Sequence, residues 1–158
     1  MLQPGDIAPD FEIPVLIGGV KRRLLLSEQL KKRNLVLAFY PLNWENSSAE
    51  QMVRYQVERE KFSARNAEVA AISVDSIMNT TAWEREIGPF DFLMASDFWP
   101  HGEVSRRYGV FREEQPSAGA SERAVFVVDR SGRIAFSRSY PLNSVPDVLE
   151  PLTVLHSL

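Results

Sequence analysis

Three short runs of apolar residues, each bounded by polar or turn-forming residues, stand out along the chain. They are residues 35–40, 69–74 and 124–128. A continuous apolar run of this length is typical of a strand buried on both faces of a sheet. A further strand is predicted at 134–137, because the turn-rich residues 129–132 favour a hairpin with the strand before it. Residues 24–26 are expected to form a short edge strand.

Helical signals lie between the predicted strands. Ser47 and Glu50 have the spacing of a capping box, which predicts a helix that starts at Ser47 and ends near Ala64. Its expected inward positions are Met52, Val53, Val57 and Phe62. Further helices are expected at 79–87, at 101–108 and from Ser144 onward, the last one kinked or shortened by Pro151.

The order of these elements predicts the fold class. A strand, helix and strand are followed by two helices, a hairpin and a final helix. Helical crossovers imply parallel strand pairs and the tight turn implies an antiparallel pair. An α/β protein with a central mixed sheet flanked by helices in this order has the thioredoxin-like arrangement. We expect one domain over residues 1–158, because the candidate breaks near Gly18, Pro41 and Gln115 are only as long as loops.

Composition narrows the possible chemistry. The chain has 158 residues, 44% of them hydrophobic, which is enough for a real core. It has no cysteine, so disulfides, cysteine-ligated zinc, iron–sulfur clusters and thiol catalysis by this polypeptide are excluded. The two histidines, His101 and His156, lie far apart in sequence, so we expect no metal site and no cofactor.

Charge and hydropathy indicate where the protein acts. A net charge of −3 argues against nucleic acid as a partner. Apolar stretches are far shorter than the ~20 residues that a membrane span needs, so no membrane association is expected. Residues 1–14 have no basic segment before an apolar run and contain three prolines, so they do not resemble a secretory signal. A cytoplasmic protein is expected.

The segment between the first buried strand and the long helix is the place where a site is expected. In open α/β sheets, ligands gather beyond the carboxyl ends of strands, where helix N-termini meet them. Residues 41–48 occupy this place. Unsatisfied backbone N–H groups and the positive end of the helix dipole give such a segment the physical character of an anion site.

The same segment carries a family resemblance. Phe39, Tyr40 and Pro41, with a helix opening seven residues beyond the proline, resemble the active-site loop of peroxiredoxins, the alkyl hydroperoxide reductase and thiol-specific antioxidant family. That family's signature is Pro-x-x-x-Thr/Ser-x-x-Cys. Four more segments are similar to the family in the same order, namely residues 5–11, 72–76, 96–111 and 122–134. The resemblance implies a peroxiredoxin-type thioredoxin-like fold and a homodimer.

The resemblance can be carried over residue by residue. Pro41 matches the signature proline, and Arg123 matches the strand arginine that holds the thiolate and the peroxide in the family. Ser48 stands at the position of the peroxidatic cysteine, and Glu45 at the position of the threonine or serine. A serine hydroxyl ionises far less readily than a thiol and cannot form a sulfenic acid. Two of the four key positions therefore lack the expected chemistry.

Three functional interpretations follow. In the first, the chain is a peroxiredoxin-like protein without thiol peroxidase activity that serves as a binding or interaction module. In the second, an active one-cysteine peroxidase, which reduces hydroperoxides with an external thiol reductant, is represented here with serine in place of cysteine at position 48. The third, a hydrolase that uses Ser48 as nucleophile, has little support because no histidine stands in the motif. We further expect Glu45 to form an ion pair with Arg123 and to fill the former peroxide pocket.

Simpler structural roles compete with these interpretations. Ser48 can be an ordinary first-turn residue, Ser47 a plain helix N-cap, and Arg123 half of a structural salt bridge. Asp75, at the end of a strand, is a candidate site residue, although capping a helix is the simpler role. Residues 58–61 and 84–86 are expected to form solvated helix faces. The tryptophans are expected in the core or at an interface, and the candidates for a dimer surface are Phe39, Tyr40, Trp44, Phe90 and Phe92.

Overall fold

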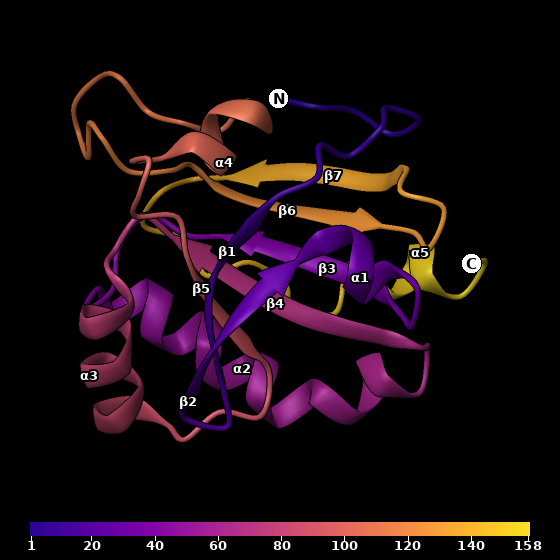
Figure 1. Cartoon of the computed structure of the whole chain (residues 1–158), viewed down its shortest axis with the longest axis horizontal. Helices are drawn as coiled ribbons and strands as arrows, with labels where there is room; N and C mark the ends of the chain where they lie inside the picture. Colours follow the sequence, from indigo (N-terminus) through magenta and orange to yellow (C-terminus); the bar gives the residue numbers. More distant parts are fainter.

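The computed structural model describes residues 1–158 and places seven strands in one sheet (Figure 1). The strands are β1 (Glu12–Ile17), β2 (Val20–Leu25), β3 (Asn34–Phe39), β4 (Ala67–Ser73), β5 (Leu93–Ser96), β6 (Arg123–Val128) and β7 (Ile134–Tyr140). The helices are α1 (Leu26–Leu30), α2 (Asn46–Ser63), α3 (Ile77–Ile87), α4 (Glu103–Arg107) and α5 (Leu152–Leu155). The strand order across the sheet is β2-β1-β5-β4-β3-β6-β7.

The predicted mixed sheet is confirmed at its centre. Every residue of β3 is buried, as its apolar run indicates. β3 pairs in parallel with β4 and β4 in parallel with β5, whereas β3 and β6 are antiparallel, as are β6 and β7. Because β3, β4 and β5 run in one direction, their carboxyl ends meet at the same edge, which therefore carries the loop that leads into α2.

The sheet separates two hydrophobic layers. On one face, α1 and α4 cover a layer that contains Phe39, Tyr108 and Phe126, whose rings contact one another edge-on or tilted. On the other face, α2, α3 and α5 supply Tyr55, Trp83 and Leu155 to the second layer. Figure 1 shows α2 lying along that face and α1 on the opposite one. This two-layer cover is what a sheet buried on both faces requires.

Two strands were not predicted from the sequence. β1 contains Pro14 and has exposed residues at both ends, so its apolar pattern is interrupted. β5 has only four residues, too few for a periodic signal. The Gly18–Gly19 break is the turn of the β1–β2 hairpin, where both glycines have positive φ values of 57° and 78°. Glycine adopts this conformation at no steric cost.

Several predicted helix features are wrong. α2 starts at Asn46 rather than after a Ser47 cap, because its N-cap is Glu45 and the Ser47 hydroxyl donates to the Asn143 carbonyl instead. Met52 and Phe62 point inward, but Val53 and Val57 are exposed; Val57 retains 73% of its accessible surface.

The C-terminal helix is also wrong in extent. Residues 144–151 form turns and irregular backbone, and the only helix in this region is the four-residue α5. The Glu150 carboxylate accepts a hydrogen bond from Tyr140 and forms an ion pair with Arg138, so side-chain contacts to β7 hold this segment instead of helical ones. Pro151 stands just before α5, at its N-cap, rather than inside a longer helix.

Candidate functional site

The loop between β3 and α2 is fixed by a network of polar contacts on its outer side. The Asn43 backbone N–H donates to the Asp75 carboxylate at 2.8 Å. The Asn43 side chain accepts from the Tyr40 hydroxyl at 2.7 Å and donates to Asn79 and Thr80. Ser76, not Asp75, caps α3, so the predicted capping role of Asp75 is wrong. Its carboxylate instead ties this loop to the end of β4.

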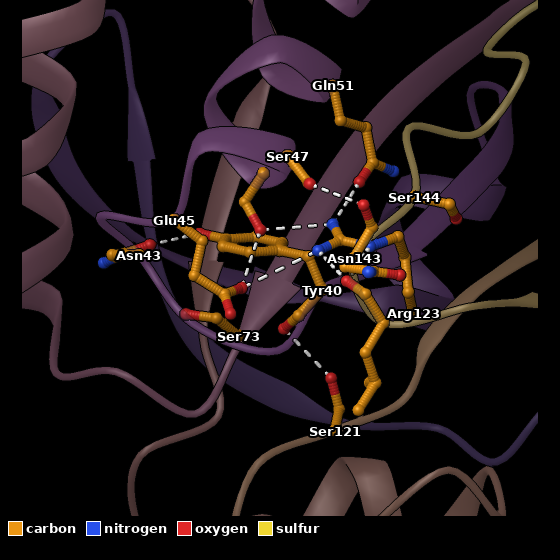
Figure 2. A network of polar contacts seen from close by, with 12 residues as sticks. Tyr40, Asn43, Glu45, Ser47, Gln51, Ser73, Ser121, Arg123, Asn143 and Ser144 are labelled. Atoms are coloured by element: carbon orange, nitrogen blue, oxygen red, sulfur yellow. Dashed lines mark hydrogen bonds and ion pairs between the residues drawn. The ribbon is translucent and has the colours of Figure 1, made fainter. Parts of the chain in front are cut away.

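Trp44 lies at the tip of the loop. Its φ of 71° is in the left-handed region, and its indole N–H donates to Asn79 at 2.9 Å. Its ring is otherwise exposed. This conformation turns the chain so that Glu45, the next residue, faces Ser48 and Arg123. Figure 2 shows the Glu45 carboxylate directed toward the Arg123 guanidinium.

Ser48 lies at the centre of the candidate site. It is fully buried in the first turn of α2. Its hydroxyl donates to Glu45 Oε1 at 3.1 Å and accepts from Arg123 Nη1 at 3.1 Å. Three of the four residues selected from the sequence thus form one connected group (Figure 2). Pro41, the fourth, is buried at the start of the same loop.

Arg123 begins β6 and is fully buried, which is rare for a charged residue and requires partners. Nη1 donates to Ser48 Oγ and to Gln51 Oε1, while Nε and Nη2 both donate to the Leu142 carbonyl. Burial lowers the pKa of Arg123, and the nearby Glu45 carboxylate acts in the opposite direction. With four hydrogen bonds around it, the guanidinium stays charged.

The predicted ion pair between Glu45 and Arg123 is present but loose. Glu45 Oε1 and Arg123 Nη2 are 3.7 Å apart, close enough for an ion pair but beyond hydrogen-bond distance. The Glu45 side chain is 36% exposed, so it lies at the border of the site rather than inside it. That Glu45 fills the former peroxide pocket stays a prediction, because the cavity of about 280 Å³ beside the ion pair is lined by Glu45 and Arg123 but not by Ser48 or Pro41.

That cavity lies at the N-terminus of α2. Its walls come from the α2 N-terminus, from β6 and from two loops that are distant in sequence; they are formed by Glu45, Asn46, Ser47, Pro116, Ser117, Arg123, Leu142 and Asn143. The Ser47 hydroxyl donates to the Asn143 carbonyl at 2.9 Å and closes one side. Only one lining residue, Leu142, is hydrophobic, but carbon atoms make up most of the surface exposed to the cavity.

Two residues of the site were not predicted from the sequence. Gln51 is fully buried, accepts from Arg123 at 2.9 Å and has its amide nitrogen 3.4 Å from the Tyr55 hydroxyl. Burial raises the pKa of Tyr55 to about 12, so its hydroxyl stays protonated at neutral pH. The only sequence signal was spacing, because residues three and seven positions after Ser48 lie on the same face of a helix.

The arrangement offers hydrogen-bond donors rather than a catalytic base. The Ser48 hydroxyl is in contact with a carboxylate and a guanidinium. His101 is hydrogen-bonded to the Gly119 carbonyl and His156 to Arg65, so both imidazoles are engaged elsewhere. No group of three or more His, Asp or Glu side chains is placed to hold a metal ion. What remains is a buried positive charge at a helix N-terminus, beside a small cavity.

The expected surface aromatics are mostly in the core. Phe39, Tyr40, Phe90 and Phe92 are all buried, so they do not form a dimer surface, whereas Trp44 remains exposed. Trp83 is in the core as expected, and Trp99 is exposed. Within residues 84–86, Glu84 is buried and accepts from the Phe90 N–H at 3.2 Å, which contradicts the predicted solvated position.

Comparison with solved structures identifies the class of fold. The chain superposes on the reduced 2-Cys peroxiredoxin of Plasmodium vivax with a TM-score of 0.89 at 23% identity, covering 99% of this chain and 81% of that one. AhpC of Mycobacterium tuberculosis gives a TM-score of 0.86 at 23% identity and covers 99% and 98%. The fold is thus the thioredoxin-like fold of peroxiredoxins, as predicted.

Sequence comparison identifies the family. Residues 4–137 match the AhpC/TSA family. Alkyl hydroperoxide reductase E of Mycobacterium tuberculosis and that of Mycobacterium bovis are each 35% identical over 147 residues, which is 93% of this chain and 92% of the relative. The chain belongs to the AhpC/TSA family. No helix in the structure has both the length and the apolar character needed to cross a membrane.

Proposed function

We propose that this chain is a peroxiredoxin-like protein without thiol peroxidase activity, which keeps the family's pocket as a binding site. One observation supports this most strongly. Ser48 stands where the resemblance places a nucleophilic cysteine, and its hydroxyl is held between Glu45 and Arg123. A hydroxyl in this position has no sulfur to oxidise, so the two-electron reduction of a peroxide has no acceptor on the chain.

Glu45 supports the same proposal. A threonine hydroxyl both donates and accepts hydrogen bonds, whereas an ionised carboxylate only accepts. Its negative charge at the border of the cavity also partly offsets the positive charge of Arg123. The Glu45 charge therefore weakens the electrostatic stabilisation that Arg123 could give to an attacking anion.

The alternative is an active one-cysteine peroxidase, whose substrate is a hydroperoxide and whose reductant is an external thiol, with serine in place of cysteine at position 48. The intact positions of Pro41 and Arg123 favour it, since the pocket around residue 48 is still assembled. Glu45 argues against it, because one substitution at position 48 leaves residue 45 unexplained. The codon for residue 48 in the source gene distinguishes the two.

The functional test is hydroperoxide consumption with dithiothreitol as reductant. The four proteins to compare are the serine-bearing chain, S48C, E45T and S48C/E45T. We expect no turnover by the first and by E45T, weak turnover by S48C, and clear turnover by the double variant. Turnover by the serine-bearing chain would refute the proposed function. Full activity of S48C alone would favour the alternative, because Glu45 would then be compatible with peroxidase chemistry.

We also propose that residues 1–158 act as one cytoplasmic domain that forms a homodimer. The surface that supports the dimer consists of Trp44, Met78, Phe98 and Trp99, and we call it the aromatic edge. All four are exposed and lie in segments that follow β3, β4 and β5, whose ends meet at one edge of the sheet. Large exposed apolar side chains, three of them aromatic, in segments that leave the sheet at one edge are typical of a protein interface.

A further inference from the structure

Three turns at the edge of the sheet opposite the candidate site carry a concentration of positive charge. They connect α1 to β3 (residues 31–33), α2 to β4 (residues 64–66) and β6 to β7 (residues 129–133). Because β6 runs antiparallel to β3, its carboxyl end meets the amino ends of β3 and β4. Together the turns contain six exposed basic residues and one carboxylate, although the whole chain has a net charge of −3. This asymmetry creates a local positive potential that the overall charge does not reveal.

Hydrogen bonds hold the three turns against one another. The Asn34 side chain accepts from the Arg130 backbone N–H at 3.0 Å, and the Asn34 backbone N–H donates to the Asn66 carbonyl at 3.0 Å. The Arg130 guanidinium donates to the carbonyls of Leu30 and Lys31 at 3.4 Å and 2.6 Å. Figure 1 shows the three turns at the right-hand end of the sheet. Their charges are therefore presented on a fixed scaffold rather than on independent loops.

Most of these cations have no ion-pair partner in the chain. Lys31 is paired with Glu28 at 2.9 Å, and the Asp129 carboxylate accepts hydrogen bonds from within its own turn. The half-buried Glu68 carboxylate lies near the α1–β3 turn without forming an ion pair. The five basic residues without an ion pair form a surface that we call the basic edge: Lys32, Arg33, Arg65, Arg130 and Arg133.

A pocket with apolar walls opens beside the basic edge. Its volume is about 210 Å³, which is room for one large aliphatic side chain, and its wall includes Gly132 and Arg133 of the β6–β7 turn. The one carboxylate in the wall, that of Asp10, accepts from two backbone N–H groups of the chain. Four of the nine lining residues are hydrophobic, namely Ile7, Ala8, Leu26 and Leu30. The pocket therefore places an apolar recess directly next to positive charges.

We propose that the basic edge and this pocket form a docking surface for an acidic peptide segment of a protein partner, with one apolar side chain of that segment in the pocket. Charge complementarity supports the acidic character, since the carboxylates of the segment supply the counter-charges that the chain lacks. The pocket favours a polypeptide over other polyanions. A nucleic acid has no aliphatic side chain to fill it, and a bilayer keeps its acyl chains beneath the charged headgroups. The surface lies at the opposite edge of the sheet from Ser48, so this inference does not depend on the proposed function.

The probe is a short, fluorescein-labelled, glutamate-rich peptide with one central leucine, and its binding is followed by fluorescence anisotropy. Lys32→Glu/Arg33→Glu should weaken binding at least about tenfold, because it reverses two charges that face the peptide. Both side chains are exposed and unpaired, so the fold is retained, which circular dichroism checks. Lys21→Glu/Arg22→Glu is the matched control. It makes the same change of charge at exposed positions of β2, which three strands separate from β3, and should alter binding less than about twofold.

Changes in the peptide test the two parts of the surface separately. Replacing its leucine with alanine should weaken binding at least about threefold, because less apolar area is buried in the pocket. Replacing its glutamates with glutamines should abolish binding, because the counter-charges are then absent. Equal affinity for the leucine and alanine peptides would overturn the inference, since the pocket would then be unused.

The remaining outcomes distinguish other occupants. Equal peptide binding by Lys32→Glu/Arg33→Glu and the unmodified chain would overturn the inference, and so would an equal loss in the control pair, because only net charge would then matter. Phosphatidylserine vesicles or duplex DNA that bind the unmodified chain but not Lys32→Glu/Arg33→Glu, without any peptide binding, would assign the basic edge to a membrane or a nucleic acid instead. Loss of self-association in that variant, again without peptide binding, would assign it to a second copy of the chain.

Discussion

Ser48 connects the only carboxylate at the site to the buried guanidinium. Its hydroxyl is the one group that contacts both Glu45 Oε1 and Arg123 Nη1 by hydrogen bonds. The position selected for nucleophilic chemistry in the resemblance thus has a measurable structural role here. Whether that role matters can be tested through stability, independently of any activity.

Ser48→Ala should lower the free energy of unfolding by about 1–3 kcal/mol, because a buried donor of a charged group loses its acceptor. Urea denaturation followed by tryptophan fluorescence measures this. The control is Ser47→Ala, whose hydroxyl donates to the Asn143 carbonyl at a half-buried position, so water can replace it. We expect a change of less than about 0.5 kcal/mol for the control. Equal stability of Ser48→Ala and the unmodified chain would contradict the prediction.

Tyr55 should make the protein sensitive to alkali. Burial raises the pKa of Tyr55 to about 12, whereas an unfolded tyrosine ionises near ~10. A group whose folded pKa is raised contributes its full stability below the unfolded pKa, and that contribution is lost as pH rises toward the folded pKa. Going from about pH 9 to about pH 11 should therefore cost about 1 kcal/mol from this residue alone.

Tyr55→Phe removes this contribution and leaves the other buried tyrosines, Tyr40 and Tyr108, whose pKa values burial also raises. The fall in unfolding free energy between the two pH values should then be about 1 kcal/mol smaller than in the unmodified chain. Urea denaturation at both pH values measures the difference. An unchanged fall would show that the Tyr55 hydroxyl ionises as readily in the folded chain as in the unfolded one.

At the scale of elements, what could be predicted from the sequence depended on how local the cause was. β3, β4 and β6 can be predicted because each is buried on both faces and is a nearly unbroken apolar run. β1 cannot be predicted in this way, because pairing with β2 and β5, rather than its own pattern, makes it a strand. The C-terminal helix was overestimated because contacts from β7 hold residues near Glu150 in turns.

The candidate site also contains residues that the sequence can predict and residues that only tertiary contacts define. Pro41, Glu45, Ser48 and Arg123 could be selected because they stand at fixed spacings in a motif. Gln51 and Tyr55 could not, since a polar and an aromatic residue in a helix are common and only the approach of β6 makes them partners of Arg123. The exposure of Val53 and Val57 has the same kind of cause, because the direction in which α2 crosses the sheet decides which stripe is buried.

Glu84 in α3 gives a test at this scale. Its carboxylate accepts a hydrogen bond from the Phe90 N–H and so fixes the chain between α3 and β5. Glu84 is only 5% exposed, so water cannot easily replace this contact. Glu84→Ala should cost about 1–3 kcal/mol of unfolding free energy, since a buried N–H is left without an acceptor. Glu86→Ala, two positions along the helix and exposed, should change stability by less than about 0.5 kcal/mol. Thermal unfolding of the two variants in parallel compares them, and equal midpoints would contradict the proposed contact.

At the scale of the whole molecule, the proposed homodimer would cover the aromatic edge. Trp99 retains 80% of its accessible surface, and Met78 is similarly exposed in the first turn of α3. Hydrogen bonds from Trp44 to Asn79 and from Ser96 to the Asp75 carbonyl hold the neighbouring loops against one another. The aromatic edge is therefore presented by a fixed scaffold, which lowers the entropy lost on association.

Replacing Trp99 with glutamate should convert the dimer into a 17.9 kDa monomer, because a charge at the centre of an apolar interface has to be desolvated. Sedimentation velocity at micromolar concentrations measures the change. Val20→Glu is the matched control. Val20 is also exposed, but it lies beside the turn of the β1–β2 hairpin. Because β1 runs antiparallel to β5, this turn lies near the amino end of β5, whereas Trp99 follows its carboxyl end. We expect Val20→Glu to remain dimeric. A monomeric unmodified chain would refute the dimer itself. A dimeric Trp99→Glu would place the interface elsewhere on the molecule. The next surface to test would then be β7, because β2 and β7 are the two outer strands of the sheet and Val20→Glu already tests β2.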